Sequence, residues 1–318
     1  MREINRDGAS LLTYPAFHDG ALRSRALRFM GMGDPAITAP SRFDWRVGAA
    51  LVALHVGALL ALLPMFFRPS AVVVMFVLIY ATSGLGVSLG FHRLLTHRSL
   101  RLAKPIEYAI ALLGTLALQG GPISWVGTHR IHHAHSDHEG DPHNANLGFF
   151  WSHFEWLLYS KAHCRERSDE YRRAVTDLTA DPYYVFLENN QLQLQAALAL
   201  ILFALGGWSW VVWGIFARSV VVYHITWLVN SASHTTGYRT YRTTDRSTNC
   251  WWLALLGWGE GWHNNHHAFP FSARHGLQWY EFDLTWLTIK FLAFVRLAKD
   301  IKLPTPEMRH RLRLTTPS

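Results

Sequence analysis

The sequence predicts an all-α integral membrane protein whose chain crosses the bilayer in four helices. Half of the 318 residues are hydrophobic and only 16% are charged, whereas typical soluble domains carry roughly 25% charged residues. Four stretches with no charge, or with a single one, are long enough to form membrane helices, and the histidine clusters lie outside them. Together these observations predict a bundle of four spans with polar, histidine-rich segments at one end.

The first two spans are expected at residues 47–67 and 70–91. Neither 47–67 nor 69–91 contains Asp, Glu, Lys or Arg, and each is long enough to cross roughly 30 Å of hydrocarbon as a helix. The short Arg68-Pro69 link between them predicts a hairpin. We expect His55, within the first span, to be a packed polar residue.

The second pair of spans is expected at residues 189–206 and 208–230. Arg218 is the only charged residue from 189 to 238, and Gly206-Gly207 provides a point where the chain can fold back. Because a charge within a span is costly in lipid, we expect Arg218 to face the bundle interior or to snorkel outward. The apolar run 108–126 contains Gln119-Gly-Gly-Pro122, which predicts a surface or re-entrant segment instead of a fifth span.

The spans divide the chain into an N-terminal segment (1–46), a principal domain (47–304) and a C-terminal tail (305–318). An amphipathic stretch at 284–297 is expected to lie on the membrane surface. With four spans, both termini and the long polar segments share one face, while the two short loops on the opposite face carry a single basic residue, Arg68. The basic face is therefore expected to be cytoplasmic. Since the basic residues are dispersed without a dense patch, we expect no nucleic-acid partner.

Two histidine boxes repeat the same spacing about 130 residues apart. The boxes are HRIHH and HNNHH, and their histidines are His129, His132, His133, His263, His266 and His267. On a helix, positions three and four apart share a face, so the three imidazoles of each box are expected to converge on one point. Clustered neutral imidazoles favour borderline transition metals over magnesium or calcium. The boxes therefore predict a metal site.

Three further histidines are expected to complete this site. The segment HRLLTH contains His92 and His97, and His234 stands four residues after Asn230. A lone histidine is more often a hydrogen-bonded core residue than a ligand, but two repeated boxes with these additional positions favour metal binding. The four-span topology brings all nine histidines to one face, and nine are too many for one ion. Two metals and redox chemistry on a lipid are favoured over hydrolysis, because no HExxH-type pairing is present.

Eight other polar residues, four carboxylates and four histidines, lie near the boxes. Four carboxylates are interpreted either as residues that orient ligand imidazoles or as solvated loop charges: Asp137, Glu139, Asp141 and Glu260. Four more histidines break the box spacing and are expected to be supporting or structural residues: His135, His138, His143 and His153.

The boxes HRLLTH, HRIHH and HNNHH, with Asn230-Ser-Ala-Ser-His234, resemble those of membrane fatty-acid desaturases of the delta-9, stearoyl-CoA desaturase-like type. The similarity covers roughly residues 72–304. The resemblance implies a cytosolic helical cap that holds two irons, with the nine histidines as ligands and Asn230 reaching one iron through water. It also implies a bent tunnel for the acyl chain, with Gln119, Trp125, Thr226 and Trp227 at the bend; apart from the resemblance, the tryptophans would be read as ordinary packing. The implied reaction consumes O2 and two electrons, removes two hydrogens and leaves a cis double bond and water.

The sequence departs from the animal members of this family just before the second box. Gly127-Thr128 stand where animal members carry an Arg-Asp pair that touches the CoA headgroup, and residues 121–129 resemble the plant and cyanobacterial branch. The acyl carrier is therefore open between CoA and a membrane lipid. No His-Pro-Gly-Gly haem motif follows the last box, so the resemblance implies a separate electron donor, either a ferredoxin or a cytochrome b5-like protein.

Two alternatives remain at the level of sequence. A fatty acyl hydroxylase, or a desaturase of other regiochemistry, would use the same di-iron site. A histidine-rich membrane metal transporter is a different class, but it should place its ligands near the bilayer midplane within broken helices. Here the histidine clusters lie outside the expected spans, which disfavours a transporter.

Overall fold

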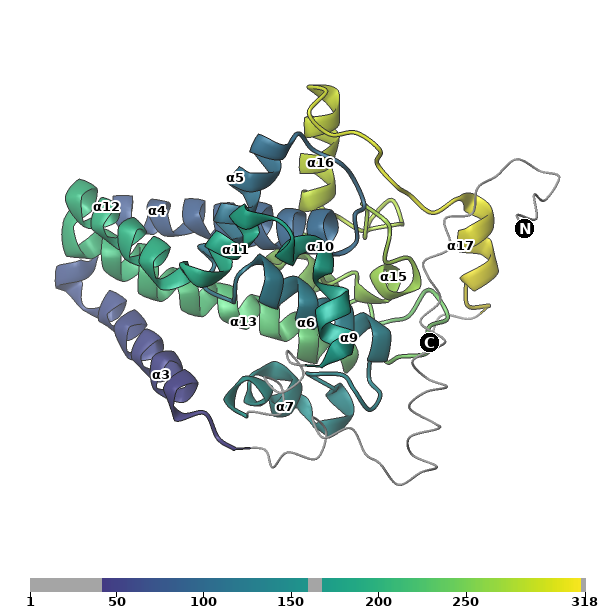
Figure 1. The fold of residues 1–318 in the computed structure, drawn as a ribbon, viewed down its shortest axis with the longest axis horizontal. Helices are drawn as coiled ribbons and strands as arrows, with labels where there is room; N and C mark the ends of the chain where they lie inside the picture. Colours follow the sequence, from purple (N-terminus) through teal and green to yellow (C-terminus); the bar gives the residue numbers. More distant parts are fainter. Residues whose placement is uncertain (1–41, 160–167, 316–318) are drawn as a thin grey trace. The chain divides into compact units, whose positions relative to one another are not determined.

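Long apolar helices dominate the structure, a computed structural model that describes residues 42–159 and 168–315 (Figure 1). Within these ranges the secondary structure is helical, with isolated β-bridges and no strand, which confirms the all-α prediction. All of these residues belong to one unit, 41–318. Most of the predicted N-terminal segment and the last three residues of the tail lie outside the described residues.

Three helical stretches are long and apolar enough to cross a membrane. The first runs from Trp45 to Leu62 and the second from Pro69 to Thr96, with η2 (Pro64–Phe66) between them; the third runs from Gln191 to His234. Their elements are α3 (Trp45–Leu59), η1 (Leu60–Leu62), α4 (Pro69–Ile79), η3 (Tyr80–Thr96), α12 (Gln191–Val211), η6 (Val212–Ala217), α13 (Arg218–Ser231) and η7 (Ala232–His234). In the first stretch only 6% of the apolar window is buried, so its Leu and Val side chains require an apolar surrounding.

The third stretch reverses direction at Gly207. This glycine has φ +64° and ψ −160°, a combination that a residue with a Cβ adopts only with strain. Beyond it, Val211 and Ile215 pack against Leu202, and Gly214 leaves room for the Leu202 side chain. A straight helix of 44 residues would be about 66 Å long, roughly twice the thickness of the hydrocarbon core. The reversal instead gives two shorter helices, seen side by side in Figure 1 as α12 and α13.

The chain leaves helical geometry between α5 (Lys104–Thr115) and α6 (Pro122–His135), and α13 supplies the missing hydrogen bonds. Arg218 is fully buried, and its Nη1 donates to the Leu116 carbonyl at 2.5 Å. Tyr223 donates its hydroxyl to the Leu118 carbonyl at 2.6 Å. Irregular backbone among apolar helices is stable only where such partners replace water. Arg218 therefore faces the bundle interior, the first of its two predicted positions.

The remaining helices of the described ranges have at most 11 residues each. They are η4 (Ala145–Leu147), α7 (Phe149–His153), η5 (Glu155–Leu158), α9 (Asp169–Ala174), α10 (Thr176–Thr179), α11 (Pro182–Asn189), α14 (Trp251–Leu256), α15 (His263–Ala268), α16 (Leu284–Phe294) and α17 (Pro306–Leu312). Several begin at a side chain that accepts from a free backbone N–H of the first turn, as Ser168, Asp181 and Asp283 do. These caps fix the starts of helices too short to be stable alone.

Candidate metal centre

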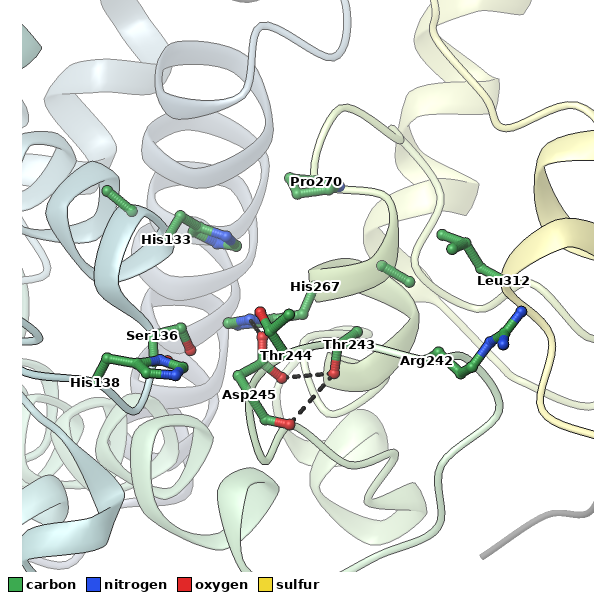
Figure 2. A pocket seen from close by; sticks show the side chains of 12 residues that line it. His133, Ser136, His138, Arg242, Thr243, Thr244, Asp245, His267, Pro270 and Leu312 are labelled. Atoms are coloured by element: carbon green, nitrogen blue, oxygen red, sulfur yellow. Dashed lines mark hydrogen bonds and ion pairs between the residues drawn. The ribbon is translucent and has the colours of Figure 1, made fainter. Parts of the chain in front are cut away.

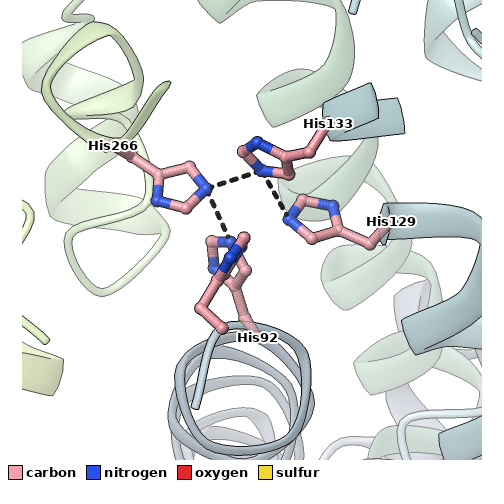
Figure 3. A group of neighbouring side chains, drawn as sticks. His92, His129, His133 and His266 are labelled. Carbon is pink, nitrogen blue, oxygen red and sulfur yellow. Dashed lines mark hydrogen bonds between the residues drawn. The ribbon is translucent and has the colours of Figure 1, made fainter. Parts of the chain in front are cut away.

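Five imidazoles from three parts of the fold form the first histidine group, defined as His92, His97, His129, His133 and His266. Their candidate ligand atoms all lie within 4.8 Å of one another. η3 supplies His92 and is followed directly by His97, α6 supplies His129 and His133, and α15 supplies His266. Nε2 of His266 lies 3.0 Å from that of His92 and 2.9 Å from that of His133, and Figure 3 shows these rings turned toward one another.

The winding of η3 explains how His92 and His97 reach one group. On an α-helix, residues five apart point about 140° away from each other. η3 is wound as a π-helix, whose hydrogen bonds join residues five apart, and the His97 N–H donates to the His92 carbonyl at 3.1 Å. The wider turn therefore brings the two imidazoles close, with ring centres 5.0 Å apart.

Four imidazoles form the second histidine group, defined as His132, His234, His263 and His267, again with ligand atoms within 4.8 Å. The boxes HRIHH and HNNHH thus each divide between the two groups. The expectation that the three imidazoles of such a box converge on a single point is therefore wrong. On α6, the side chain at 132 is turned about 60° from that at 129 and about 100° from that at 133. The turn is large enough for one helix to present imidazoles to two neighbouring points.

Carboxylates fix the ring orientation of four of these histidines. The contacts to imidazole Nδ1 atoms are Asp137 with His234 (2.8 Å), Asp141 with His132 (2.9 Å), Asp245 with His267 (2.8 Å) and Glu260 with His92 (2.5 Å). The three aspartate contacts are hydrogen bonds. A carboxylate only accepts, so the Nδ1 atoms of His234, His132 and His267 carry the ring protons and their Nε2 atoms present lone pairs. For Asp137, Asp141 and Glu260 the orienting interpretation is therefore favoured, whereas Glu139 is exposed.

These lone pairs converge in a way that fits a cation. In the second group, Nε2 of His263 lies 3.0 Å from Nε2 of both His234 and His267, and its ring cannot donate from one nitrogen to two acceptors. Within 42–159 and 168–315, the buried Nε2 atoms of His97 and His132 have no hydrogen-bond partner. Two nitrogens bound at right angles, each about 2.1 Å from one metal ion, would lie about 3.0 Å apart. The donor sets of both groups therefore fit borderline transition metals.

Burial and neighbouring charges keep the groups in their metal-binding protonation states. Burial, followed by the neighbouring imidazoles, holds the pKa of five of these histidines well below its usual value, namely His97, His129, His133, His263 and His266. Burial would raise the pKa of Asp141, but His132 and His143 hold it well below its ordinary value. His132 is the exception, because Asp141 raises its pKa despite the burial of that ring and so favours the protonated imidazole. Neutral imidazoles and ionised carboxylates are the forms that metal binding requires.

Three of the four residues expected at the tunnel bend lie near the break between α5 and α6. Gln119 donates from Nε2 to Thr226 Oγ1 at 2.9 Å. Trp125, one turn before His129 on α6, stacks on that imidazole with ring centres 5.1 Å apart. The structure thus brings Gln119 and Thr226 together and places Trp125 against the first histidine group.

The other two predicted residues lie on α13. Trp227 is buried and packs against Tyr223 and His153, so its side chain is directed away from the Gln119–Thr226 contact by the 100° step of the helix. Asn230 is half-buried and stands about one helical turn before His234. Its position on the helix is next to the second histidine group.

Comparison with known proteins agrees with this arrangement. Residues 68–290 match the family described as fatty acid desaturase. The chain belongs to the fatty acid desaturase family. It is 54% identical over 268 residues to an sn-1 stearoyl-lipid 9-desaturase of Anabaena variabilis, covering 84% of this chain and 97% of the relative.

Other relatives differ in the substrate and in the double-bond position that their names give. A palmitoyl-monogalactosyldiacylglycerol delta-7 desaturase of Arabidopsis thaliana is 45% identical, covering 86% of this chain and 74% of the relative. An icosanoyl-CoA 5-desaturase of Limnanthes douglasii is 42% identical, covering 85% of this chain and 75% of the relative. The family membership is therefore shared across lipid-linked and CoA-linked substrates.

Sequence reasoning missed two polar residues of the desaturase that contact the histidine groups. Asp245 holds His267 from a loop and is itself held by Thr243 and Ser247. His275 is buried, with its Nδ1 3.4 Å from Glu260. Neither residue lies on a helix that carries a box. In the sequence, each could be noticed only as a polar residue in the non-helical segments near the last box.

A surface pocket of about 340 Å³ reaches both histidine groups of the desaturase. Its lining includes His133 of the first group and His267 of the second, whose rings stack with centres 4.5 Å apart. Figure 2 shows His133 and His138 on one side, Arg242 and Leu312 on the other, and His267 with Asp245 between them. None of the four predicted tunnel residues lines this pocket.

Proposed function

We propose that this protein is an O2-dependent desaturase that introduces a cis-9 double bond into a saturated acyl chain carried on a membrane lipid. The observation that carries the proposal is the pair of adjacent histidine groups, one of five imidazoles and one of four, in a chain with 54% identity to a stearoyl-lipid 9-desaturase. The reaction removes two hydrogens from adjacent carbons. With O2, two electrons and two protons it yields the double bond and two molecules of water.

Two irons are the metals that suit this chemistry, one in each histidine group. When bound, they supply the activation of O2. The nine histidines hold them, and we assign Asn230 to the second group, where it would act through water. Asp137, Asp141, Asp245 and Glu260 keep the Nε2 lone pairs directed inward, because each contacts the opposite nitrogen of its imidazole.

The membrane arrangement that fits is four crossings. The reversal at Gly207 divides the third stretch into two helices, so with the first two stretches both ends of the bundle return to one side. The desaturase domain is assigned to 47–304, with a segment at 1–46 and a tail at 305–318 on the same side as the histidine groups. That side carries nearly all Lys and Arg residues, so we assign it to the cytoplasm.

A lipid carrier is favoured over CoA by the packing of Gly127. A Cβ at this position would lie 2.5 Å from the ring of Tyr171 on α9. The resemblance places a charged residue that touches the CoA headgroup at this position in animal members, whereas here an aromatic ring lies against the glycine. An arginine at 127 would require α9 to move.

The acyl chain is proposed to bend where the helical backbone is broken. The Gln119–Thr226 hydrogen bond joins the break to α13, and Trp125 stacks on His129 of the first histidine group. A saturated chain that follows these side chains would pass the histidines at a fixed carbon. Trp227 is proposed to support the bend from the other face of α13.

A metal transporter is the less favoured reading. The histidines of η3 and η7 stand at the ends of the helical stretches Pro69–Thr96 and Gln191–His234. Transported ions are bound near the bilayer midplane, which these positions do not provide.

Expression in a host without delta-9 activity, together with a ferredoxin or cytochrome b5 system, tests the proposal. Gas chromatography with mass spectrometry should find new cis-9 monounsaturated chains with the natural protein and none with His266→Ala. Hydroxylated chains, or double bonds elsewhere, would reassign the product. No change with either donor would overturn the enzyme assignment.

The carrier is tested in isolated membranes. A lipid labelled in both glycerol and acyl chain should be desaturated with its label ratio unchanged, because the chain never leaves the glycerol. A changed ratio, with faster conversion of added acyl-CoA, would assign the substrate to CoA.

A further inference from the structure

The pocket in Figure 2 is a point where solvent meets both histidine groups. His133 and His267 both line it. His133 is half-buried, whereas the side chain of His267 exposes only 2%, as little as the rings of His132, His234, His263 and His266. One pocket therefore reaches a member of each group at the same place. A redox partner bound there would lie beside one imidazole of each group.

The pocket wall is tied rigidly to the second group. Thr243 and Thr244 line the pocket beside Asp245. The Asp245 carboxylate bonds His267 Nδ1 at 2.8 Å and also accepts from the Thr243 hydroxyl at 2.8 Å. A partner that contacts Thr243 is thus separated from the His267 imidazole only by the Asp245 side chain.

The pocket rim is strongly basic. Two basic segments contribute to it, residues 239–246 and 306–313, of which Arg242, Thr243, Thr244, Asp245 and Leu312 line the pocket. The rest of the lining comes from 133–138 and 267–270. Together the two basic segments hold six arginines, which are Arg239, Arg242, Arg246, Arg309, Arg311 and Arg313, against two carboxylates, Asp245 and Glu307. Asp245 is already bonded to His267. These two segments therefore keep a net positive charge, while the facing wall, 133–138, contains Asp137 and is followed by the exposed Glu139.

Three of these arginines donate to uncharged acceptors. Arg242 donates to the Arg311 carbonyl at 2.9 Å, Arg246 to the Asn146 side-chain oxygen at 2.9 Å, and Arg309 to the Leu277 carbonyl at 3.1 Å. These acceptors are dipoles, not carboxylates. Guanidinium groups held in this way remain available for the carboxylates of a partner.

We propose that this basic rim is the docking surface for a small acidic protein that carries a one-electron redox centre, and that its electrons enter past His133 and His267. The inference rests on the proposed function, because only an enzyme that consumes electrons needs such a partner. Each encounter oxidises the partner by one electron, and two encounters supply the two electrons of one turnover. Complementary charge would raise the rate of encounter and make it salt-dependent.

The test reverses charge on the rim and compares it with an equal change elsewhere. The rim variant is Arg242→Glu/Arg311→Glu, and the control is Arg101→Glu/Lys302→Glu, whose side chains are exposed on another part of the surface. Binding of a plant-type [2Fe–2S] ferredoxin and of cytochrome b5, both acidic, is measured by biolayer interferometry from low to high salt. We expect at least a tenfold loss of affinity in the rim variant for the donor used, a smaller salt slope, and a change within twofold in the control.

Desaturation measured against donor concentration separates docking from chemistry. The rim variant should show a raised KM for the donor and an unchanged kcat, while the control matches the natural protein. If the natural protein desaturates but binding and KM are unchanged in the rim variant, or if it binds neither acidic donor at low salt, docking at this rim is overturned and the proposed function stands. If the natural protein forms no double bond with either donor, the proposed function fails. If the rim variant loses affinity for short-chain phosphatidylglycerol but not for the donors, the rim belongs to the membrane surface and the proposal is also overturned.

Discussion

The two histidine groups differ in how the protein supports them. The first has five imidazoles and one carboxylate, Glu260, which is shared with the buried Arg93 at 3.2 Å. The second has four imidazoles, and carboxylates orient three of them: Asp137, Asp141 and Asp245. The second group thus compensates for one imidazole fewer with more negative charge around the rings. Within one fold, the site with more imidazoles thus has fewer supporting carboxylates, and the site with fewer imidazoles has more.

The largest effect is expected from removing one imidazole from each group. His266→Ala and His267→Ala should each reduce the double-bond product below about 1% of the natural level and lower the bound metal by about one equivalent, because a missing ligand opens one site. Product is measured by gas chromatography with mass spectrometry, and metal by plasma mass spectrometry.

His55→Ala is the matched control for these two variants. His55 is also part of an imidazole contact, with its Nε2 3.2 Å from that of His224, but it belongs to neither histidine group. It should keep most of the activity and the full metal content. A His266→Ala variant that stays active and binds two metals would show that His266 is not a ligand of the first histidine group.

A smaller effect is expected from the carboxylates, and it should differ between the groups. Asp245→Asn and Glu260→Gln should each weaken metal retention by about 10- to 100-fold. Glu260→Gln should also lower the melting temperature, because Arg93 is fully buried and would keep a charged partner only in Asp283, at a cost of about 1–3 kcal/mol. Asp245→Asn removes no partner from a buried arginine.

Metal analysis and thermal unfolding in detergent distinguish the two variants. Equal melting temperatures would show that Glu260 supports only the imidazole and that the first group is no more embedded in the core than the second. A wild-type metal content in both variants would remove the carboxylates from the metal centre.

The difference between the groups also shows what local sequence can reveal. The spacing of HRIHH and HNNHH was enough to predict which histidines gather, because periodicity on a short helix is a local property. It did not predict that His132 and His266 each leave their box for the other group. That division depends on where α6, α15, η3 and η7 meet, which no single segment encodes.

The supporting residues illustrate the same limit. Asp137 and Asp141 lie within ten residues of a box and were candidates from the sequence alone. Asp245, 22 residues before His267, reaches it through a loop and was missed. The cost of a charge in lipid predicts that Arg218 faces the bundle interior or snorkels outward. Its acceptor, the Leu116 carbonyl, is 102 residues away in the chain, so the sequence does not decide between the two.

The smallest effect is expected from Asn230, and it should fall on the second group alone. We expect Asn230→Ala to weaken metal retention there by about 2- to 10-fold, since its contact through water is replaceable by a second water. The His266→Ala background isolates the second group, and the His267→Ala background isolates the first. Release of the remaining metal to a chelator should be faster with Asn230→Ala only in the His266→Ala background. Faster release in both backgrounds would show that Asn230 acts on the packing of α13 and not on one site, and the asymmetry between the groups would then rest on the carboxylates alone.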